Sequence, residues 1–113
     1  METSTYIKHT KTSPKKLRLV AKSIKKMPVR HALDTLSLSR TRASKILYKS
    51  ILSALDTFLS SSKEEMSMVQ FKLLTIEEGS RLKRFRSGSK GNAKPYRRKM
   101  SHIKIILTTQ TQN

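Results

Sequence analysis

The chain has 113 residues, and its 25 Lys and Arg against 7 Asp and Glu give a formal net charge of +18. This length allows one modest hydrophobic core, so we expect a single domain over residues 1–113. The charge repels itself in a compact state and predicts a polyanionic partner. Cysteine is absent and no apolar run approaches the roughly 20 residues of a spanning helix, which excludes disulfides, thiolate metal sites and a transmembrane helix.

Few residues are available for a core. Hydrophobic residues make up 35% of the chain and aromatic residues 5%, so we expect a lean core that is supplemented by folding against the partner. The segment 1–16 lacks the apolar middle region of a secretory signal and is only weakly similar to organelle transit peptides. We therefore expect it to stay on the protein.

A strand and a helix are predicted first. Residues 5–11 are expected to form a short strand. Ser13-Pro14 predicts a helix start, because a Ser N-cap binds a free amide of the first turn and Pro lacks an amide that would need a partner. We expect Pro28 to end this helix. One face is apolar and cations cover the rest, with Leu17, Val20, Ala21 and Ile24 against Lys15, Lys16, Arg18, Lys22 and Lys25.

Two more helices are expected. The first is short and follows Pro28, with an apolar side made of Val29, Ala32, Leu33 and Leu36. Capping hydroxyls for the next element come from Ser37, Ser39 and Thr41. The other helix runs from Arg42 to about Leu59 and is expected to be the central packing element. Its apolar face comprises Ala43, Ile46, Leu47, Ile51, Ala54, Leu55 and Phe58.

Alternating apolar residues predict two strands in the second half of the chain. After the break at Ser60–Lys63, residues 68–76 are expected to place Val69, Phe71, Leu73 and Thr75 on one side. Residues 101–108 repeat the pattern, with Ile103, Ile105 and Leu107 on one side. The two segments are expected to pair antiparallel.

A protruding hairpin is predicted between these strands. Residues 79–100, GSRLKRFRSGSKGNAKPYRRKM, contain nine Lys or Arg, no acid, and a Gly-Ser-Lys-Gly-Asn cluster typical of a turn. Arms of about nine residues would carry the turn on the order of 30 Å from the sheet. Because a lone two-stranded hairpin is marginal in water and its cations repel, we expect RNA to hold its shape.

The cations of the hairpin and the first helix are the candidate RNA ligands. The hairpin holds no acid, and none lies between Glu2 and Asp34 to pair with the helix. Phosphate contacts fix a docked pose without reading bases, so we expect recognition of RNA shape. The candidate RNA-binding residues are Lys11, Lys15, Lys16, Arg18, Lys22, Lys25, Arg81, Lys83, Arg84, Arg86, Lys94, Arg97, Arg98, Lys99 and His102.

Two aromatic residues of the hairpin leave alternatives open. Phe85 and Tyr96 lie among its cations, where they either stack on exposed bases or face each other across the strands. The sequence favours neither arrangement.

No enzyme, metal site, cofactor or small-molecule substrate is predicted. Gly88–Gly91 lacks the Gly-Lys-Ser/Thr order and the following helix of a nucleotide-binding loop. The acid pairs Glu64-Glu65 and Glu77-Glu78 would point to opposite faces of a strand, which does not suit acid–base catalysis. Three histidines stand singly without a carboxylate at ligand spacing, namely His9, His31 and His102.

Three segments resemble the universal ribosomal protein L-twenty-two family. SPKKLRLVAKSI is similar to the first helix of that family, ALDTL to its short second helix, and EEGSRLKRFRSGSKGNAKPYRRKMSHIKI to its hairpin and last strand. The resemblance covers nearly the whole chain. It implies an α+β domain in which three helices pack on a small antiparallel sheet with a long protruding β-hairpin.

The resemblance also implies a place in the ribosome. The domain would dock on large-subunit ribosomal RNA, and the hairpin tip would line the nascent-peptide exit tunnel beside a neighbouring protein of the L-four family. Macrolide antibiotics bind near that constriction in family members. The implied location is the ribosome of a bacterial cytoplasm, a plastid or a mitochondrion. The implied tip residues are Gly88, Ser89, Lys90, Gly91, Asn92 and Ala93.

The chain departs from the family pattern in two places. The long helix usually ends near an Asn-Ala-Glu-Asn motif, where this chain has Leu55–Leu59, and the tip often carries Arg or Pro in place of Ser87, Gly88 and Asn92.

Two rival functions are also considered for so basic a chain. A free nucleic-acid chaperone or DNA-binding protein would have the same charge. A cationic membrane-active peptide would use the amphipathic first helix, but would have to bind lipid in competition with RNA.

Overall fold

The computed structural model describes residues 2–61, 68–91 and 93–109. Within these ranges the chain forms three helices, three strands and a 3-10 turn near the end of the hairpin. In chain order they are β1 (Glu2–Thr10), α1 (Pro14–Ile24), α2 (Val29–Leu38), α3 (Arg42–Ser61), β2 (Val69–Ser87), η2 (Ser89–Gly91) and β3 (Ala93–Thr109).

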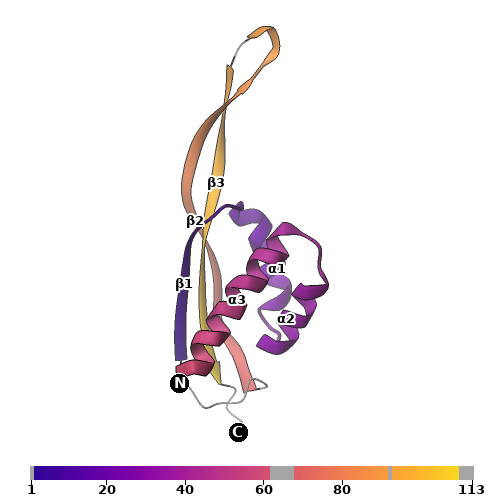
Figure 1. The fold of residues 1–113 in the computed structure, drawn as a ribbon, viewed down its shortest axis with the longest axis vertical. Coiled ribbons are helices and arrows are strands. Elements are labelled where there is room, and N and C mark those ends of the chain that lie inside the picture. Colours follow the sequence, from indigo (N-terminus) through magenta and orange to yellow (C-terminus); the bar gives the residue numbers. More distant parts are fainter. Residues whose placement is uncertain (1, 62–67, 92, 110–113) are drawn as a thin grey trace.

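The strands form one antiparallel sheet in the order β1-β3-β2, with β3 in the centre. The helices lie together on one face of its lower part, and the upper parts of β2 and β3 continue beyond them as a two-stranded hairpin (Figure 1). The molecule is therefore long and thin, measuring 66 × 24 × 21 Å. This arrangement confirms the predicted α+β fold with a protruding hairpin.

The predicted start of α1 is confirmed. Ser13 is its N-cap and its hydroxyl accepts a hydrogen bond from the amide of Lys16, while Pro14 occupies the first turn. The helix ends at Ile24, earlier than Pro28, because the chain already turns there and the amide of Met27 binds the carbonyl of Ile24. Pro28 instead directly precedes α2 and accepts its first backbone hydrogen bond, from Ala32.

The start of α3 is fixed by three hydroxyl groups. The Thr41 hydroxyl accepts a hydrogen bond from the amide of Ser44, as a capping residue should. The buried Ser44 hydroxyl lies 2.7 Å from that of Thr41 and donates to that of Ser39 at 2.8 Å. Of the predicted apolar face of α3, every residue but Ile46 is buried, and Ile46 packs against the same core.

The predicted inner face of β2 is wrong beyond Phe71. The pairing with β3 shifts between Phe71 and Leu73, so two residues of β2 oppose one of β3. Such a bulge inverts the alternation of side chains. Leu74 and Ile76 are consequently buried, whereas Leu73 is 38% exposed.

Strand β3 has the buried face that was predicted, and strand β1 begins earlier in the chain than predicted. Ile103, Ile105 and Leu107 are fully buried beneath the helices. Strand β1 begins at Glu2, opposite Thr108, rather than at residue 5. As an edge strand it needs little apolar surface, so its alternation is weak in the sequence.

Candidate nucleic-acid interface

The two arms of the hairpin are paired so that cations oppose cations. Like charges at directly opposite positions of an antiparallel ladder repel each other. The opposed charges therefore disfavour this pairing in the free protein, where Arg81 is partly compensated by Glu78 at 3.6 Å, and an anionic partner would stabilise it. The three opposed pairs in the backbone register are Arg81 with Lys99, Lys83 with Arg97, and Arg86 with Lys94.

The predicted turn at the end of the hairpin is present. It consists of η2, in which Lys90 (φ 59°) and Gly91 (φ 74°) both adopt left-handed backbone angles. Two such residues in succession reverse the chain tightly. Lys90 is exposed at this turn, while Asn92 of the predicted tip lies outside the described residues.

The register separates the two aromatic residues of the hairpin. Phe85 lies opposite Pro95, and the position opposite Tyr96 is Arg84. The alternative in which the two aromatics form a directly opposed pair is therefore not realised. The Phe85 ring is 72% exposed among the cations, in a position where a base could stack on it.

The predicted cations of α1 differ in what they contact. Lys15, Lys16, Lys22 and Lys25 are exposed on the helix, as is Lys11 before it. The Arg18 guanidinium instead donates two hydrogen bonds to the carbonyl oxygen of Ile76, at 3.2 Å from Nε and 3.0 Å from Nη2. Arg18 thus ties α1 to β2 at the point where the hairpin leaves the sheet.

We call the segments 76–79 and 101–103 the hairpin root, and side chains from the N-terminal part of the chain contact it. The Tyr6 hydroxyl donates a hydrogen bond to Oε2 of Glu77 at 2.7 Å. This hydrogen bond, aided by desolvation and by the negative charge of Glu77, raises the pKa of Tyr6. The phenol therefore stays protonated and remains a donor at neutral pH.

On the other strand of the root, the buried Ser101 hydroxyl donates to the carbonyl of Thr12 at 2.5 Å. Together with the contacts of Arg18 and Tyr6, this bond holds both strands of the root. The direction of the hairpin is thereby fixed relative to the helices.

His102 is placed at the same root. Its Nδ1 accepts a hydrogen bond from the backbone amide of His9 at 3.1 Å, and the two rings meet edge to face with centroids 5.1 Å apart. A Cβ on Gly79 would lie 3.1 Å from Cε1 of His102 and from the backbone of Met100, so a side chain at Gly79 would crowd this approach. The predicted RNA ligand His102 is thus also part of the joint between β1 and β3.

Within residues 2–61, 68–91 and 93–109, no three His, Asp or Glu gather in a way that could hold a metal ion. In the same ranges no helix is long and apolar enough to cross a membrane. The predicted acid pair Glu64-Glu65 lies outside the described residues, and Glu77 and Glu78 bond to Tyr6 and Arg81 respectively.

A second group of cations was missed by the sequence prediction. It consists of exposed residues at the junction of α2 and α3 and along α3, namely Arg40, Arg42, Lys45 and Lys49. The available signal was the absence of any acid from residue 35 to residue 55. The regular apolar spacing of this helix is the stronger signal, and it predicts only the buried face.

Comparison with known proteins settles the family. The family model described as Ribosomal protein L22p/L17e matches residues 5–108. The chain belongs to this family. The L22 family resemblance predicted from the sequence is thereby confirmed, and the chain is a structural ribosomal protein rather than an enzyme.

Curated relatives match the chain along its length. A protein of Opitutus terrae named Large ribosomal subunit protein uL22 is 33% identical over 113 residues, which cover both chains completely. Proteins of the same name from Mesoplasma florum and Desulfotalea psychrophila are 31% and 34% identical and cover 97% and 95% of the chain, and 98% and 97% of their own lengths. The L22 family similarity thus includes the hairpin.

Proposed function

We propose that the chain is a structural constituent of the large ribosomal subunit that binds large-subunit rRNA, supports its assembly and lines the peptide exit tunnel with its hairpin tip. The observation that carries this proposal is the pairing of cation with cation along the hairpin. A polyanion that runs along both arms would neutralise these charges and release its own counterions.

The rRNA-binding residues in this proposal come from two elements. Lys11, Lys15, Lys16, Lys22 and Lys25 present exposed ammonium groups on and before α1. Arg18 and His102 would contact RNA next to the hairpin root, where both already hold the fold together. On the hairpin, the ligands are Arg81, Lys83, Arg84, Arg86, Lys94, Arg97, Arg98 and Lys99.

The proposed tunnel residues are 88–93, at the end of the hairpin. A two-stranded ribbon is thin enough to pass between RNA helices and is held at one end by the root contacts of Arg18 and Tyr6. Its tip carries one Lys and otherwise small or polar residues, which suits a surface along which a nascent peptide moves. The expected neighbour at this place is a protein of the L-four family.

Sedimentation tests the main proposal. Lysate of the bacterium or organelle that contains the chain is separated on a sucrose gradient in moderately high salt, and each fraction is probed for the chain. We expect it to travel with the large subunit at about one copy per particle, because many phosphate contacts hold it at that salt. Release from the subunit, or sedimentation with DNA, would favour a free nucleic-acid-binding protein instead.

A further inference from the structure

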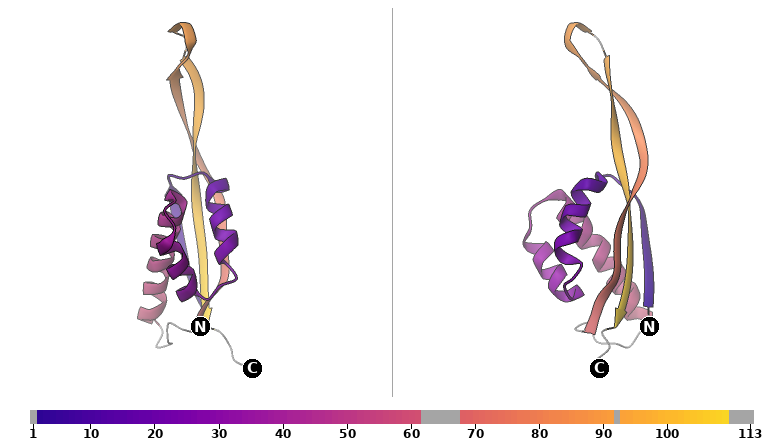
Figure 2. Two further views of the ribbon diagram at one scale, coloured as in Figure 1. Left: turned by 90° about the vertical axis from the view of Figure 1, so that its right-hand side faces the viewer. Right: turned by 180° about the vertical axis from the view of Figure 1, so that it is seen from behind.

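The antiparallel sheet has one face that the helices leave open. In Figure 1 and in the right-hand view of Figure 2 the helices lie together on the same side of the strands, and within the described ranges none lies on the other side. Because side chains alternate along a strand, those between the buried Ile103, Ile105 and Leu107 point to this other side. Two rows of paired residues form its centre, which we call the open patch: Ser4, Ile106 and Leu73, and then Tyr6, Lys104 and Thr75.

Side-chain contacts mark both ends of the open patch. At one end the Lys72 ammonium of β2 donates a hydrogen bond to Oε1 of Glu2 in β1. At the other end the Tyr6 hydroxyl of β1 donates to Oε2 of Glu77 in β2. Since β3 lies between β1 and β2 and buried side chains fill its helical side, both contacts cross it on the open side. The open patch is therefore a fixed surface across three strands.

Glu77 places a negative charge at one end of the open patch. Its carboxylate is held by the Tyr6 hydroxyl at 2.7 Å, but in the described part of the chain it forms no ion pair, although the sequence contains 25 Lys and Arg. A fixed carboxylate repels phosphate and attracts an ammonium or guanidinium group. A partner on the open patch is thus expected to bring a Lys or Arg to Glu77 rather than a phosphate.

Apart from Lys104, the side chains of the open patch are apolar, aromatic or small. Leu73 is 38% exposed and lies in the same row as Ile106, and Tyr6 is 40% exposed in the next row. The Tyr6 ring has little room for a stacked base, because the Lys8 ammonium lies 5.5 Å above its centroid and the His102 ring is 5.7 Å away. Adjoining exposed apolar side chains are typical of contacts with other proteins.

The size of the open patch decides what kind of protein partner it accepts. It is roughly 10 Å wide across three strands and about 20 Å long between the two end contacts, which gives an area of about 200 Å². A folded domain forms a stable interface with about 800 Å² of each partner. A single extended segment of about six residues matches the length and width of the patch.

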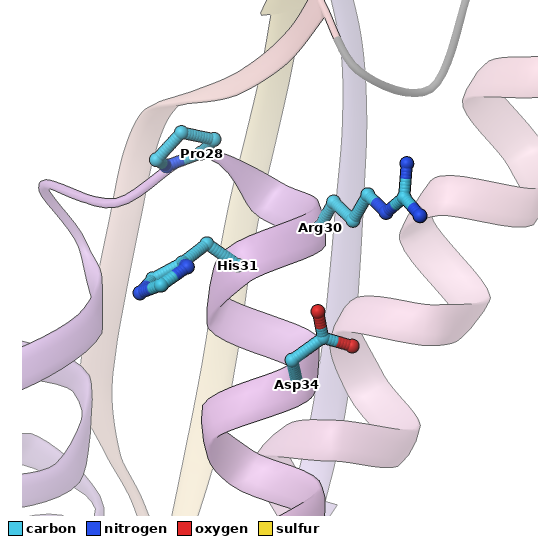
Figure 3. A pocket seen from close by; sticks show the side chains of 4 residues that line it. All are labelled: Pro28, Arg30, His31 and Asp34. Carbon is cyan, nitrogen blue, oxygen red and sulfur yellow. The ribbon is translucent and has the colours of Figure 1, made fainter.

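A depression elsewhere on the surface does not have these properties. It is lined by Pro28, Arg30, His31 and Asp34 around the start of α2, on the helical side of the sheet. Figure 3 shows Arg30 and Asp34 projecting from the same helix. Because Arg30, His31 and Asp34 are polar or charged, an apolar segment finds little to pack against there.

We infer that the open patch binds an extended segment of a neighbouring large-subunit protein. The segment packs apolar side chains on Leu73 and Ile106 and places a Lys or Arg beside Glu77. This inference rests on the proposed place of the chain in the large subunit, and adds a protein contact on a face that the proposed RNA ligands border only at His102. A second copy of the chain is not the partner, because two molecules of net charge +18 repel each other.

Photo-crosslinking in purified large subunits tests the inference. The subunits contain the full chain with Ser4→p-benzoylphenylalanine, which places the photoreactive group on the open patch. Mass spectrometry identifies crosslinked peptides, and primer extension identifies crosslinked nucleotides. The same group at Asp34, in the depression on α2, is the control position.

Two pairs of substitutions are combined with the probe at Ser4. Leu73→Lys and Leu73→Glu place opposite charges on the open patch, and Leu38→Lys is their control on α2, where Leu38 is 85% exposed. Glu77→Gln removes the negative charge but keeps an acceptor for Tyr6. Glu78→Gln is its control, because Glu78 is paired with the position of the buried Ser101 and so belongs to the other face. Circular dichroism checks that each variant is folded.

We expect the Ser4 probe to crosslink one peptide that contains apolar residues and a Lys or Arg, and the Asp34 probe not to reach it. Both Leu73 variants should lower the yield at least about tenfold, because a charged group loses hydration when apolar side chains cover it. Glu77→Gln should lower it as well, while Leu38→Lys and Glu78→Gln should leave it unchanged.

Other outcomes would overturn the inference. Crosslinks to rRNA, with the yield lowered by Leu73→Glu but not by Leu73→Lys, would show that the open patch faces phosphate. A probe that crosslinks nothing would show that the patch faces solvent, and a peptide without Lys or Arg would refute the assigned role of Glu77. If Leu73→Glu does not fold, Leu73→Lys and Glu77→Gln still decide between these outcomes.

The same subunits separate this inference from the proposed function. A chain that is present in large subunits without a protein crosslink from Ser4 refutes only the contact at the open patch. A chain that is absent from large subunits refutes the proposed function itself.

Discussion

At the scale of single residues, the side chains that fix the direction of the hairpin could not be identified from the amino-acid composition of the hairpin. The sequence marks Arg18 as one of many cations, yet its guanidinium spans from α1 to the backbone of β2. Tyr6 and His9 also contact the root, through Glu77 and His102. These contacts join residues more than fifty positions apart, so no local pattern could reveal them.

Replacement of Arg18 should therefore affect stability as well as RNA binding. We expect Arg18→Gln to lower the free energy of unfolding by about 1–2 kcal/mol, because it removes two hydrogen bonds from a charged donor to a partly buried carbonyl. Lys22→Gln removes the same charge from the same helix without losing such a contact. Urea unfolding compares the two variants, and equal stability would show that the Arg18 contacts do not stabilise the fold.

The Tyr6–Glu77 hydrogen bond should make stability depend on alkaline pH. Because the pKa of Tyr6 is raised in the folded protein, its contribution is complete below the unfolded value of about 10 and is lost as the pH rises through the folded pKa. The stability difference between the unchanged chain and Tyr6→Phe should thus be constant from neutral pH to about 9 and shrink above 10. Chemical unfolding at several pH values measures it. A difference that does not change above pH 10 would contradict the assigned bond.

At the scale of elements, the helices were predictable and the strands only in part. Ser13-Pro14 and Thr41 mark helix starts by local hydrogen bonding, and the apolar spacing of α3 shows its buried face. The bulge in β2 is different, since nothing in the alternation of Phe71 and Leu73 reveals an extra residue between them. Where the family often has a polar motif, Leu55 and Phe58 are buried and extend the packing of α3.

The bulge gives a matched pair of substitutions in adjacent residues. Leu74→Ala should cost about 2–4 kcal/mol, because Leu74 is 8% exposed and its removal leaves a cavity in the core. Leu73→Ala should cost less than about 1 kcal/mol, because Leu73 faces away from the core and is 38% exposed. Urea unfolding of both variants distinguishes the observed register from the simple alternation, which predicts the reverse order.

At the scale of the whole molecule, most of the cations lie on the helices and the hairpin arms, and the hairpin tip carries little charge. Residues 3–33, 35–55 and 79–100 contain no acid, and they supply the cations of α1, of α3 and of the hairpin respectively. The composition could predict a polyanionic partner, but only the fold shows how the elements that carry these cations are arranged. The tip, by contrast, holds a single cation, Lys90, at the end of a molecule 66 Å long.

The tip should therefore be dispensable for assembly. Replacing residues 88–92 by Asn-Gly keeps Ser87 opposite Ala93 and provides a two-residue hairpin turn, so the register of the arms is preserved. We expect this variant to enter large subunits at the level of the unchanged chain, because the arms and α1 retain nearly all the phosphate-binding charge. The shortened tip should alter macrolide sensitivity and the crosslinking of nascent peptides in the tunnel. Sucrose gradients report assembly, and drug titration with photo-crosslinking reports the tunnel. A variant that fails to enter subunits would place essential RNA contacts at the tip, and one that assembles with unchanged drug and crosslinking behaviour would place the tip away from the peptide's path.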